Sequence, residues 1–521
     1  MKRILTMLLS ITLAFTIVAC SGISPAPAAE YRDTIIYAHN TDVRELDPQR
    51  QNDTASEQVV KMIYNTLLDF DDDGTPVGDL AESWEVSDDS LTWTFHLKRG
   101  VRFHSGKEMT ANDVKATYER ALYAQGAALR TTEVIRMFTK IEVPDPYTVV
   151  ITTDEPYGPM EALMCNMFLG IMCSDTLEEY GLDISQIPEA ANGTGPYRLA
   201  SWVKDSQIVL ERFDDYFGER ARTQTIIYQV IPEAAARVMA LESGEVDSIG
   251  VINADDLPLL ESNPDITVIR GEGIGQRLFR FGCNDPIMAD TKVRQAINIA
   301  LDRQIIIDSM FNGVAYPVTS ALAPATWGYH NWGVIEQDLE KARALLAEAG
   351  YPDGFETKIV TTERYAKGVQ LAEVLAAQLS EIGIKAEIEV MEWSAISAAW
   401  NGLTAEEFDQ PIFIMGAGPS MRDADGGLRG LYTTTERYND RNYGFYSNAE
   451  VDELVFAGMR ETDMVKRAEL YKRAQEILYL EDPAGVWLFN NYNMVAFSNK
   501  LEDIQLTGIG NVLFKRAAMR R

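Results

Sequence analysis

Apolar and polar residues follow two different periods along this chain, and stretches of the two periods succeed each other. Residues 92–97 alternate strictly, so their three apolar side chains share one face, which predicts a half-buried β-strand. Residues 291–301 instead repeat apolar side chains at helical spacing behind Asp290, a residue type that caps helix N-termini. Because strand and helix patterns alternate in this way, the sequence predicts mixed α/β layers.

The clearest supersecondary pattern lies between residues 357 and 390. A strand over 357–362 is followed by a helical stripe from Val369 to Ile382, and a second strand alternates over 384–390. Together they predict a strand-helix-strand unit, the building block of domains whose ligands meet the carboxyl ends of strands.

Two more helical stripes flank this unit. One begins behind Asp338 and stops at Gly350, and the other predicts a single long helix over roughly residues 449–481, before Pro483. A chain of 521 residues exceeds one ordinary core, and it contains no repeat and no long linker. We therefore expect two or three domains that are interwoven rather than strung out.

The charge balance excludes one class of partner. The chain has 47 basic and 78 acidic residues, which gives a net charge of −31. Because this charge repels phosphate backbones, we expect no nucleic-acid partner.

The N-terminal residues have the layout of a secretory signal. Lys2 and Arg3 precede an uncharged apolar run that ends at Val18 and is too short for a stable membrane span. No later segment approaches the roughly 20 apolar residues that a membrane helix needs. The chain is therefore expected to be exported and not threaded through the bilayer.

Two cleavage sites compete at the end of this signal. Ile17-Val18-Ala19-Cys20 resembles the bacterial lipobox, which makes residues 1–19 a signal peptide, Cys20 the lipid-modified first residue and residues 20–30 a tether. Small residues at 26–29 also suit ordinary signal peptidase, although they lie well beyond the apolar run. We expect a protein at the cell surface or in the periplasm, anchored by a lipid at Cys20.

Three further cysteines are Cys165, Cys173 and Cys283. An oxidising compartment permits a bridge between Cys165 and Cys173, and isolated buried thiols are the alternative.

Signatures of catalysis and of cofactor binding are missing. The four histidines form no HExxH motif and lie near no paired cysteines, and the chain lacks a GxSxG elbow, a GxxxxGKS/T loop and a GxGxxG turn. We expect a protein that is not an enzyme, with no catalytic residue, no cofactor and no metal site.

One stretch comes close to a calcium-binding loop. Asp69, Asp71, Asp73 and Gly74 match its positions 1, 3, 5 and 6, but Leu80 stands where a bidentate Glu closes the coordination shell. We interpret this stretch as an acidic turn between two strands.

A candidate binding loop follows an apolar strand at residues 412–415. It reads GAGPSMRDADGG over residues 416–427 and holds glycines, one arginine and two aspartates. Asp423 and Asp425 are a candidate pair for acid and base chemistry, but the sequence shows no neighbour that would shift their pKa. We therefore interpret the loop as part of a binding site rather than of an active site.

Two stretches are more specific than any of these patterns. They are LAESWEVSDDSLTWTFHLKRGVRFHSGKEMTANDV at residues 80–114 and NGTGPYRL at residues 192–199. They resemble the signatures of the family 5 extracellular solute-binding proteins, the capture subunits of bacterial ABC importers for di- and oligopeptides, nickel chelates and some oligosaccharides. The resemblance continues in order through residues 242–247, 292–302, 340–350, 449–454 and 467–483.

The resemblance implies an α/β fold of the two-lobed periplasmic-binding-protein type, with an extra domain and a ligand cleft between the lobes. Residues 31–47, 193–282 and 491–521 would form a discontinuous domain I, residues 48–192 domain II, and residues 283–490 domain III.

The implied mechanism is binding and closure, because a ligand that bridges both lobes favours the closed state. In the family, the segment that contains Gly193, Gly195 and Pro196 lies where the chain crosses between lobes. These three residues are therefore hinge candidates.

In peptide-binding relatives, the loop after a domain III strand carries Trp-x-x-Asp, followed shortly by an acid and a proline, and its Asp holds the ligand α-amine. Aligning that acid and proline with Asp423 and Ala424 puts Ala417 at the tryptophan and Ser420 at the aspartate, so both markers are substituted. A gap of one or two residues would instead bring Asp423 or Asp425 to the amine.

The candidate ligand-binding residues come from this loop, from the end of the first strand and from a tryptophan that would stack on a sugar. They are Asn40, Asp42, Trp393, Gly416, Gly418, Ser420, Arg422, Asp423 and Asp425.

We expect a peptide ligand, delivered to an importer's permease whose separate ATPase supplies the energy, and we expect a monomer. Alternatives are a modified or N-blocked peptide, an oligosaccharide or a nickel chelate in the same role. A surface lipoprotein that senses a ligand without transport is the rival class, and a metal-dependent hydrolase is the third.

Overall fold

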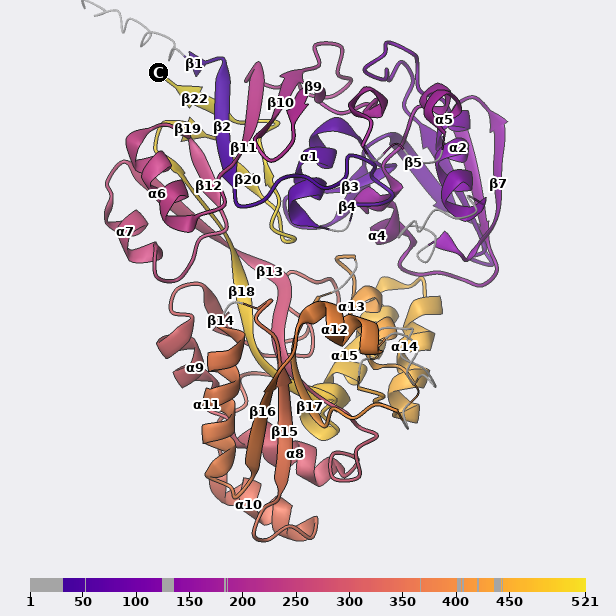
Figure 1. The fold of residues 1–521 in the computed structure, drawn as a ribbon. Coiled ribbons are helices and arrows are strands. Elements are labelled where there is room, and N and C mark those ends of the chain that lie inside the picture. Colours follow the sequence, from indigo (N-terminus) through magenta and orange to yellow (C-terminus); the bar gives the residue numbers. More distant parts are fainter. Residues whose placement is uncertain are drawn as a thin grey trace, which may run out of the picture.

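The chain forms two lobes, one above the other in Figure 1. A computed structural model describes residues 31–521 apart from residues 52, 124–134, 182–183, 185, 366, 401–403, 405–406, 419–420, 435–441 and 443, and describes residues 397–400 by their backbone.

Two long antiparallel strands, β13 (Ile266–Phe281) and β18 (Gly485–Ser498), run from one lobe into the other. They join both lobes into one sheet of eleven strands, in the order β16-β15-β17-β13-β18-β12-β2-β11-β10-β9, with β14 (Ala315–Pro317) paired to β18. The register of β13 against β18 shifts between Glu272 and Gln276, between the part that lies near β12 and the part that pairs with β17. The ladder between the lobes is therefore irregular at the crossing.

The upper lobe contains segments from both ends of the described chain. In it β2 lies parallel to both of its neighbours, β11 and β12. The strands of this part are β1 (Tyr31–Arg32), β2 (Thr34–His39), β9 (Tyr197–Val203), β10 (Gln207–Arg212), β11 (Thr225–Val230), β12 (Ser248–Gly250), β19 (Leu501–Glu502), β20 (Gln505–Leu506), β21 (Val512–Leu513) and β22 (Ala518–Arg520). Its helices are α1 (Thr54–Ile63), α6 (Ala234–Ser243) and α7 (Leu257–Ser262), with a short 3-10 turn, η2 (Pro188–Ala190).

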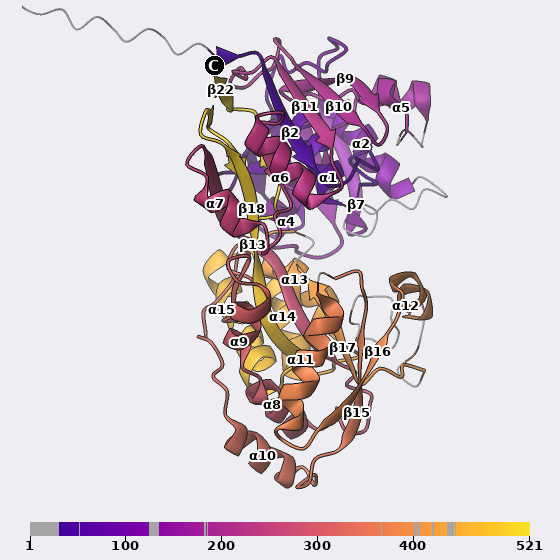
Figure 2. The same ribbon diagram turned by 60° about the vertical axis from the view of Figure 1, so that its left-hand side comes forward.

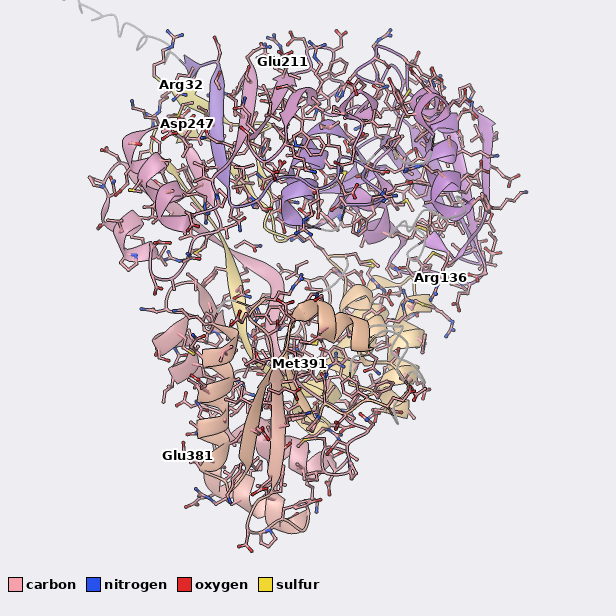
Figure 3. All side chains as sticks on the ribbon, viewed as in Figure 1. Arg32, Arg136, Glu211, Asp247, Glu381 and Met391 are labelled. Carbon is pink, nitrogen blue, oxygen red and sulfur yellow. The ribbon has the colours of Figure 1, made fainter. Side chains whose placement is uncertain are left out.

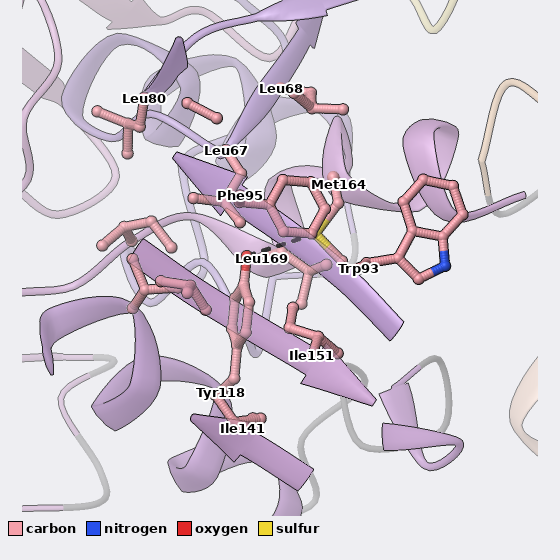
Figure 4. Close-up of a cluster of buried hydrophobic side chains, with 14 of the residues drawn as sticks. Leu67, Leu68, Leu80, Trp93, Phe95, Tyr118, Ile141, Ile151, Met164 and Leu169 are labelled. Atoms are coloured by element: carbon pink, nitrogen blue, oxygen red, sulfur yellow. Dashed lines mark hydrogen bonds between the residues drawn. The ribbon is translucent and has the colours of Figure 1, made fainter. Parts of the chain in front are cut away.

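A second sheet in the upper lobe has its own core. Its strands are β5 (Ala81–Val86), β6 (Thr92–Leu97), β8 (Thr148–Thr153) and β7 (Phe138–Asp145), in that order and all antiparallel. Strand β6 buries Trp93, Phe95 and Leu97 on one face, which confirms the alternation predicted for residues 92–97. Figure 4 shows this core, in which the Tyr118 hydroxyl approaches the Met164 sulfur at 3.7 Å. Its helices are α2 (Ala111–Tyr123), α4 (Met160–Met164), η1 (Met167–Leu169) and α5 (Ser174–Tyr180).

The lower lobe confirms the predicted strand-helix-strand unit. Strand β15 (Glu356–Thr361), α11 (Gly368–Ser380) and β16 (Lys385–Val390) follow one another, and β15 is parallel to both β16 and β17 (Ile412–Ala417). Helices cover both faces of these strands: α8 (Thr291–Ala300), α9 (Arg303–Met310), α10 (Leu339–Glu348) and α11 lie on one (Figure 2), and α13 (Ala424–Tyr432), α14 (Ala449–Arg460) and α15 (Met464–Glu476) on the other. The remaining helix is α12 (Trp393–Trp400).

The predicted caps are confirmed, and one predicted helix is wrong. Asp290 accepts a hydrogen bond from the Lys292 N–H, and Asp338 accepts one from Lys341. The single helix expected over 449–481 is instead two helices, because the extended residue Glu461 ends α14 and Asp463 caps α15. A π-helical turn, η3 (Ile477–Glu481), follows α15.

Two alternatives that the sequence left open are resolved. The three described cysteines are free, so Cys165 and Cys173 form no bridge and are buried thiols. Residues 71–75 form the turn between β3 (Leu68–Phe70) and β4 (Pro76–Gly78), in which Asp71 accepts the N–H groups of Asp73 and Thr75. This confirms the acidic turn.

The N-terminal strand is tied to the end of the upper lobe that lies away from the lower lobe (Figures 1 and 3). Arg32 pairs with Asp247 at 2.8 Å, and Asp247 also accepts the Ile36 N–H. Within the described part of the chain, no helix combines the length and apolarity needed to cross a membrane.

In the turn that precedes β15, we expect a single added methyl group to lower the stability of the protein markedly. Gly354 has φ +79°, and a Cβ there would lie 2.0 Å from the Gly383 carbonyl oxygen. Gly350 has φ +94° with open space around it. Gly350→Ala should therefore cost about 1 kcal/mol for the backbone conformation alone, whereas Gly354→Ala should cost clearly more. Thermal unfolding of both variants tests this, and equal midpoints would contradict it.

Candidate functional site

A cavity of about 520 Å³ lies between the two lobes. Helix α1, the turn between β3 and β4, and η1 form its upper wall, and residues 504–516 line one side. The lower lobe contributes Met421 and Arg422, from the loop that precedes α13, and the crossing strand β13 contributes Ile274. The candidate loop therefore reaches a cavity, as the sequence predicts for a binding element.

Charges of both signs line this cavity, and those of the upper lobe are mostly paired. Asp69 lies 3.2 Å from the Lys61 ammonium and 3.7 Å from that of Lys515. Arg516 pairs with Asp72 at 2.9 Å. The charged lining residues are Asp53, Glu57, Lys61, Asp69, Asp71, Asp72, Arg422, Lys515 and Arg516.

Arg422 differs from these bases, because no carboxylate in the described part of the chain pairs with it. Its guanidinium lies 5.2 Å from the centre of the Phe70 ring, and its Nε is 3.4 Å from the Ala325 carbonyl oxygen. Burial lowers the pKa of this guanidinium, and the charges around it do not fully offset the effect. Arg422 is therefore a partly desolvated cation at the cavity wall without an ionic partner.

Two glycines of the upper lobe let Arg422 come this close. A Cβ on Gly74 would lie 2.6 Å from its Nη2, and a Cβ on Gly508 would lie 3.2 Å from the same atom. The lower-lobe arginine thus sits between the β3–β4 turn and the segment after β20.

Asp423 and Asp425 form buried ion pairs and do not line the cavity. Asp423 is 2% exposed and receives both Nη groups of Arg467, at 2.7 and 2.5 Å. Asp425 is fully buried and pairs with Arg429, one helical turn further along α13, at 2.9 Å. Burial lowers the pKa of Arg467, but the adjoining Asp423 carboxylate more than offsets this and raises it.

The expectation that one of these acids meets a ligand amine therefore differs from the structure. Both carboxylates are held by arginines of the same lobe, and Asp423 also caps α13 by accepting the Asp425 N–H at 2.8 Å. Their role here is to hold the loop in place.

A second group of side chains gathers at the carboxyl ends of the parallel lower-lobe strands. Arg277 lies over the Tyr365 ring at 4.0 Å, and Arg364 lies over the Trp393 ring at 4.8 Å. A Cβ on Gly416 would lie 3.2 Å from the Arg277 Nη1, so this glycine makes room for the guanidinium. Trp393 and Gly416 thus lie beside two arginines that the sequence did not single out.

Of the remaining candidates, Gly418 can be placed in the structure. Gly418 lies beside the cavity, since its Cβ would be 3.1 Å from the carbonyl oxygen of the lining residue Ile274. Ser420 and Cys20 lie outside the described residues.

Asp42 is held by the upper lobe itself. It accepts hydrogen bonds from the Trp202 indole at 3.2 Å and from the Asp205 N–H at 2.8 Å. Neither Asp42 nor its half-buried neighbour Asn40 lines the cavity between the lobes. These two residues do not form the facing wall that the sequence suggested.

The hinge candidates pack inside the upper lobe. The Gly195 N–H donates to the Ile63 carbonyl at 2.8 Å, and a Cβ on Gly193 would lie 2.1 Å from the same oxygen. Both glycines and Pro196 are buried at the end of α1. The strands that connect the lobes are β13 and β18, so the candidates lie away from the crossing.

Sequence reasoning missed the upper wall because it comes from distant segments. Asp69, noticed as part of a calcium-like stretch, meets Lys515 from the C-terminus, and no local pattern links them. Among the described residues, no group of three or more His, Cys, Asp or Glu is placed to hold a metal ion.

Comparisons with known proteins agree with this architecture. A family model described as "Bacterial extracellular solute-binding proteins, family 5 Middle" matches residues 75–439. The glutathione-binding protein GsiB of Salmonella choleraesuis (strain SC-B67) is 31% identical over 465 residues, which cover 89% of this chain and 90% of the relative.

Two solved structures are similar over nearly the whole chain. One is DppA, an ABC transporter-associated periplasmic binding protein of Helicobacter pylori in complex with the peptide STSA, with a TM-score of 0.79, 28% identity and coverage of 94% of this chain and 99% of that one. The other is AgaA of A. tumefaciens R10 in complex with agropinic acid, with a TM-score of 0.76, 27% identity and coverage of 94% and 99%.

We expect loss of the ion pair between Asp423 and Arg467 to lower the stability of the protein. Asp423→Asn should leave Arg467 buried without its counter-charge, which costs about 3–5 kcal/mol. Glu469→Gln, on the same helix as Arg467, removes only an exposed partner of Lys472 at 3.6 Å and should have little effect. Thermal unfolding distinguishes the two variants. An Asp423→Asn midpoint equal to that of Glu469→Gln would refute the structural role.

Proposed function

Because the chain belongs to the family 5 bacterial extracellular solute-binding proteins, we propose that it captures a small peptide-like ligand bearing a carboxylate in the cavity between its lobes. The family consists of the substrate-binding proteins of ABC importers and not of enzymes, so the expectation that this chain is not an enzyme is confirmed. The chain is an extracytoplasmic, two-lobed solute-binding protein of such an importer.

The observation that carries the proposal is the state of Arg422. A partly buried guanidinium without a carboxylate is costly, because a desolvated charge is stable only when it is paired. A ligand carboxylate placed in the cavity would supply the missing partner, and a guanidinium binds a carboxylate through two parallel hydrogen bonds. The other lining bases are paired, since Lys61 and Lys515 share Asp69 and Arg516 pairs with Asp72.

The ligands named for similar proteins fit this chemistry. Glutathione, the tetrapeptide STSA and agropinic acid are the ligands of the three relatives described above. Glutathione and a free peptide each present at least one carboxylate. Arg277, which lies beside Gly416 of the same loop, would favour a second anionic group.

The described part of the loop offers no free carboxylate that would favour a ligand with a free α-amine. Its two acids are neutralised by Arg467 and Arg429, and Ala417 stands where the tryptophan marker of peptide binders would align. A modified or N-blocked peptide therefore fits the cavity as well as a free one. The alternative of a nickel chelate lacks support from the described histidines and acids.

We place the pivot of closure at the crossing of β13 and β18. The register of the ladder shifts between Glu272 and Gln276 and again between Arg277 and Leu278, so bending in this stretch disturbs the fewest backbone hydrogen bonds. A ligand held by Arg422 from below and by the upper wall from above would favour the closed state. Gly193, Gly195 and Pro196 then stiffen the upper lobe.

The N-terminus suits a membrane tether. The described chain begins at the end of the upper lobe away from the cleft, so a lipid on Cys20 would leave the cavity accessible (Figure 1). We propose that the protein is a monomer that delivers its ligand to a permease with a separate ATPase. A protein that senses the ligand without transport would use the same cavity.

Arg422 variants test the ligand class. Arg422→Met replaces the aliphatic part of the side chain and removes the charge, so it should lose a charge-assisted hydrogen bond of about 1.5–3 kcal/mol, which is about tenfold to a hundredfold in affinity. Arg422→Lys should recover part of the loss. Calorimetry with glutathione and with STSA, each compared with its carboxyl-terminal amide, provides the measurement.

Two controls separate the ionic contact from general effects. Arg516→Met removes a guanidinium of the same cavity that already has Asp72, and should change affinity by less than about threefold. N-acetylated STSA should bind about as well as STSA. Equal binding of acid and amide by the wild type, or unchanged binding by Arg422→Met, would overturn the proposal.

A further inference from the structure

The two lobes touch a second time, on the side of the cleft away from β13 and β18. The turn that precedes α4 in the upper lobe meets the turn between α14 and α15 in the lower lobe, and Figure 1 shows α4 above α14 on that side. The Gly158 N–H donates to the Met459 carbonyl oxygen at 2.7 Å. This hydrogen bond joins backbones that are about 300 residues apart in the chain and belong to different lobes.

Met459 extends this contact into an apolar core. Its side chain is 5% exposed and belongs to the same buried cluster as Trp93, Phe95 and Met160 of the upper lobe. The other buried members of that cluster all come from residues 67–173. One lower-lobe side chain is thus inserted into the core of the second upper-lobe sheet.

The fit of the two turns leaves no room for a side chain at position 158. A Cβ on Gly158 would lie 2.1 Å from the Glu461 carbonyl oxygen and 3.1 Å from the Arg467 Nε. Both atoms belong to the lower lobe. The glycine is therefore needed for the contact between the lobes rather than for packing within the upper lobe.

Polar pairs border the contact. Arg460 donates to Glu155 at 2.6 Å, and the hydroxyl groups of Ser90 and Thr462 lie 3.3 Å apart. The Arg460 pair is half exposed and contributes little by itself. The apolar insertion and the backbone hydrogen bond therefore dominate the contact.

We propose that residues 155–158 and 458–462 form a latch that holds the lobes together without requiring a ligand. The cavity lies between this latch and the crossing strands: Ile274 of β13 lines one part of it, and Ala162 of α4, four residues after Gly158, lines another. Rotation about β13 and β18 opens the cleft only when the latch separates. The stability of the latch therefore sets the fraction of molecules that can admit or release a ligand.

One side chain ties the latch to the ligand-site loop. The Arg467 Nε donates to the Gly458 carbonyl at 3.0 Å, while its Nη groups hold Asp423, next to Arg422. Separation of the latch and movement of the loop are thus linked through a single guanidinium. This link goes beyond ligand capture and does not depend on which ligand the cavity takes.

A disulfide trap tests whether the latch forms in solution. In the double variant Ser90→Cys, Thr462→Cys, the two sulfur atoms replace hydroxyl oxygens that are 3.3 Å apart. We expect mild oxidation of the protein, with no peptide or glutathione added, to give a bridge that shifts its mobility on a non-reducing gel. The unmutated chain, oxidised in the same way, is the control for bridges formed by the native cysteines. Absence of the bridge would overturn the proposal.

Hydrogen exchange measures how strongly the latch holds. Met459→Ala should speed exchange of the Gly158 amide by about tenfold, which corresponds to about 1.4 kcal/mol. Met464→Ala, at a methionine that is 43% exposed on α15, is the matched control and should leave the rate unchanged. The exchange rates of the β6 amides should equal those of the wild type in both variants, which would show that the upper lobe is still folded.

Gly158→Ala is a second variant that tests the latch without removing the Met459 side chain from the core. The three atoms nearest to its added methyl group all belong to the lower lobe, so the variant should fold with a normal upper lobe but fail to close the latch. We expect a larger radius of gyration in X-ray scattering than for the wild type. An unchanged radius together with unchanged exchange in Met459→Ala would refute the latch.

Discussion

The antiparallel pairing of β13 with β18 is the constraint on which the rest of the structure depends. These strands carry the chain from the upper lobe to the lower lobe and back, so the cavity receives residues from the beginning, middle and end of the sequence. The register of their ladder shifts between Glu272 and Gln276 and again between Arg277 and Leu278. Each lobe can therefore move as a packed unit, because the change in backbone angles is concentrated in a few residues.

The loop beside the cavity shows how buried charges serve position and recognition differently. Asp423 and Arg467 are both almost fully buried and satisfy each other, so their pair fixes where the loop leaves β17 and enters α13. Arg422, the preceding residue, has the opposite state: it is partly desolvated, and no carboxylate among the described residues pairs with it. A fixed neighbour holds the unpaired guanidinium in one place, so an anion that binds it does not have to order the loop first.

Local patterns were enough to predict much of the fold and little of the site. The strand at 92–97 and the unit at 357–390 were predictable because each depends on side-chain period within one segment. The helix over 449–481 was mispredicted because its apolar stripe continues on both sides of the cap at Asp463. Arg422 was found from its place after a strand, whereas Arg277 and Lys515 come from segments that no sequence pattern connects to the loop. Whether Asp423 faces a ligand depends on Arg467, which is 44 residues away.

The strongly acidic chain and a site for an anion are compatible because the two act over different distances. A net charge of −31 repels a carboxylate at long range, but counter-ions screen charges in water beyond about 8 Å at physiological salt. The lining side chains include five acids and four bases, so the cavity wall has no excess of positive charge. Lys61, Lys515 and Arg516 each lie within ion-pair distance of Asp69 or Asp72. Arg422 is the lining base with which no carboxylate of the described residues pairs. The proposed anionic ligand would therefore be recognised through short-range contact with one guanidinium, whereas the overall charge would slow its approach modestly.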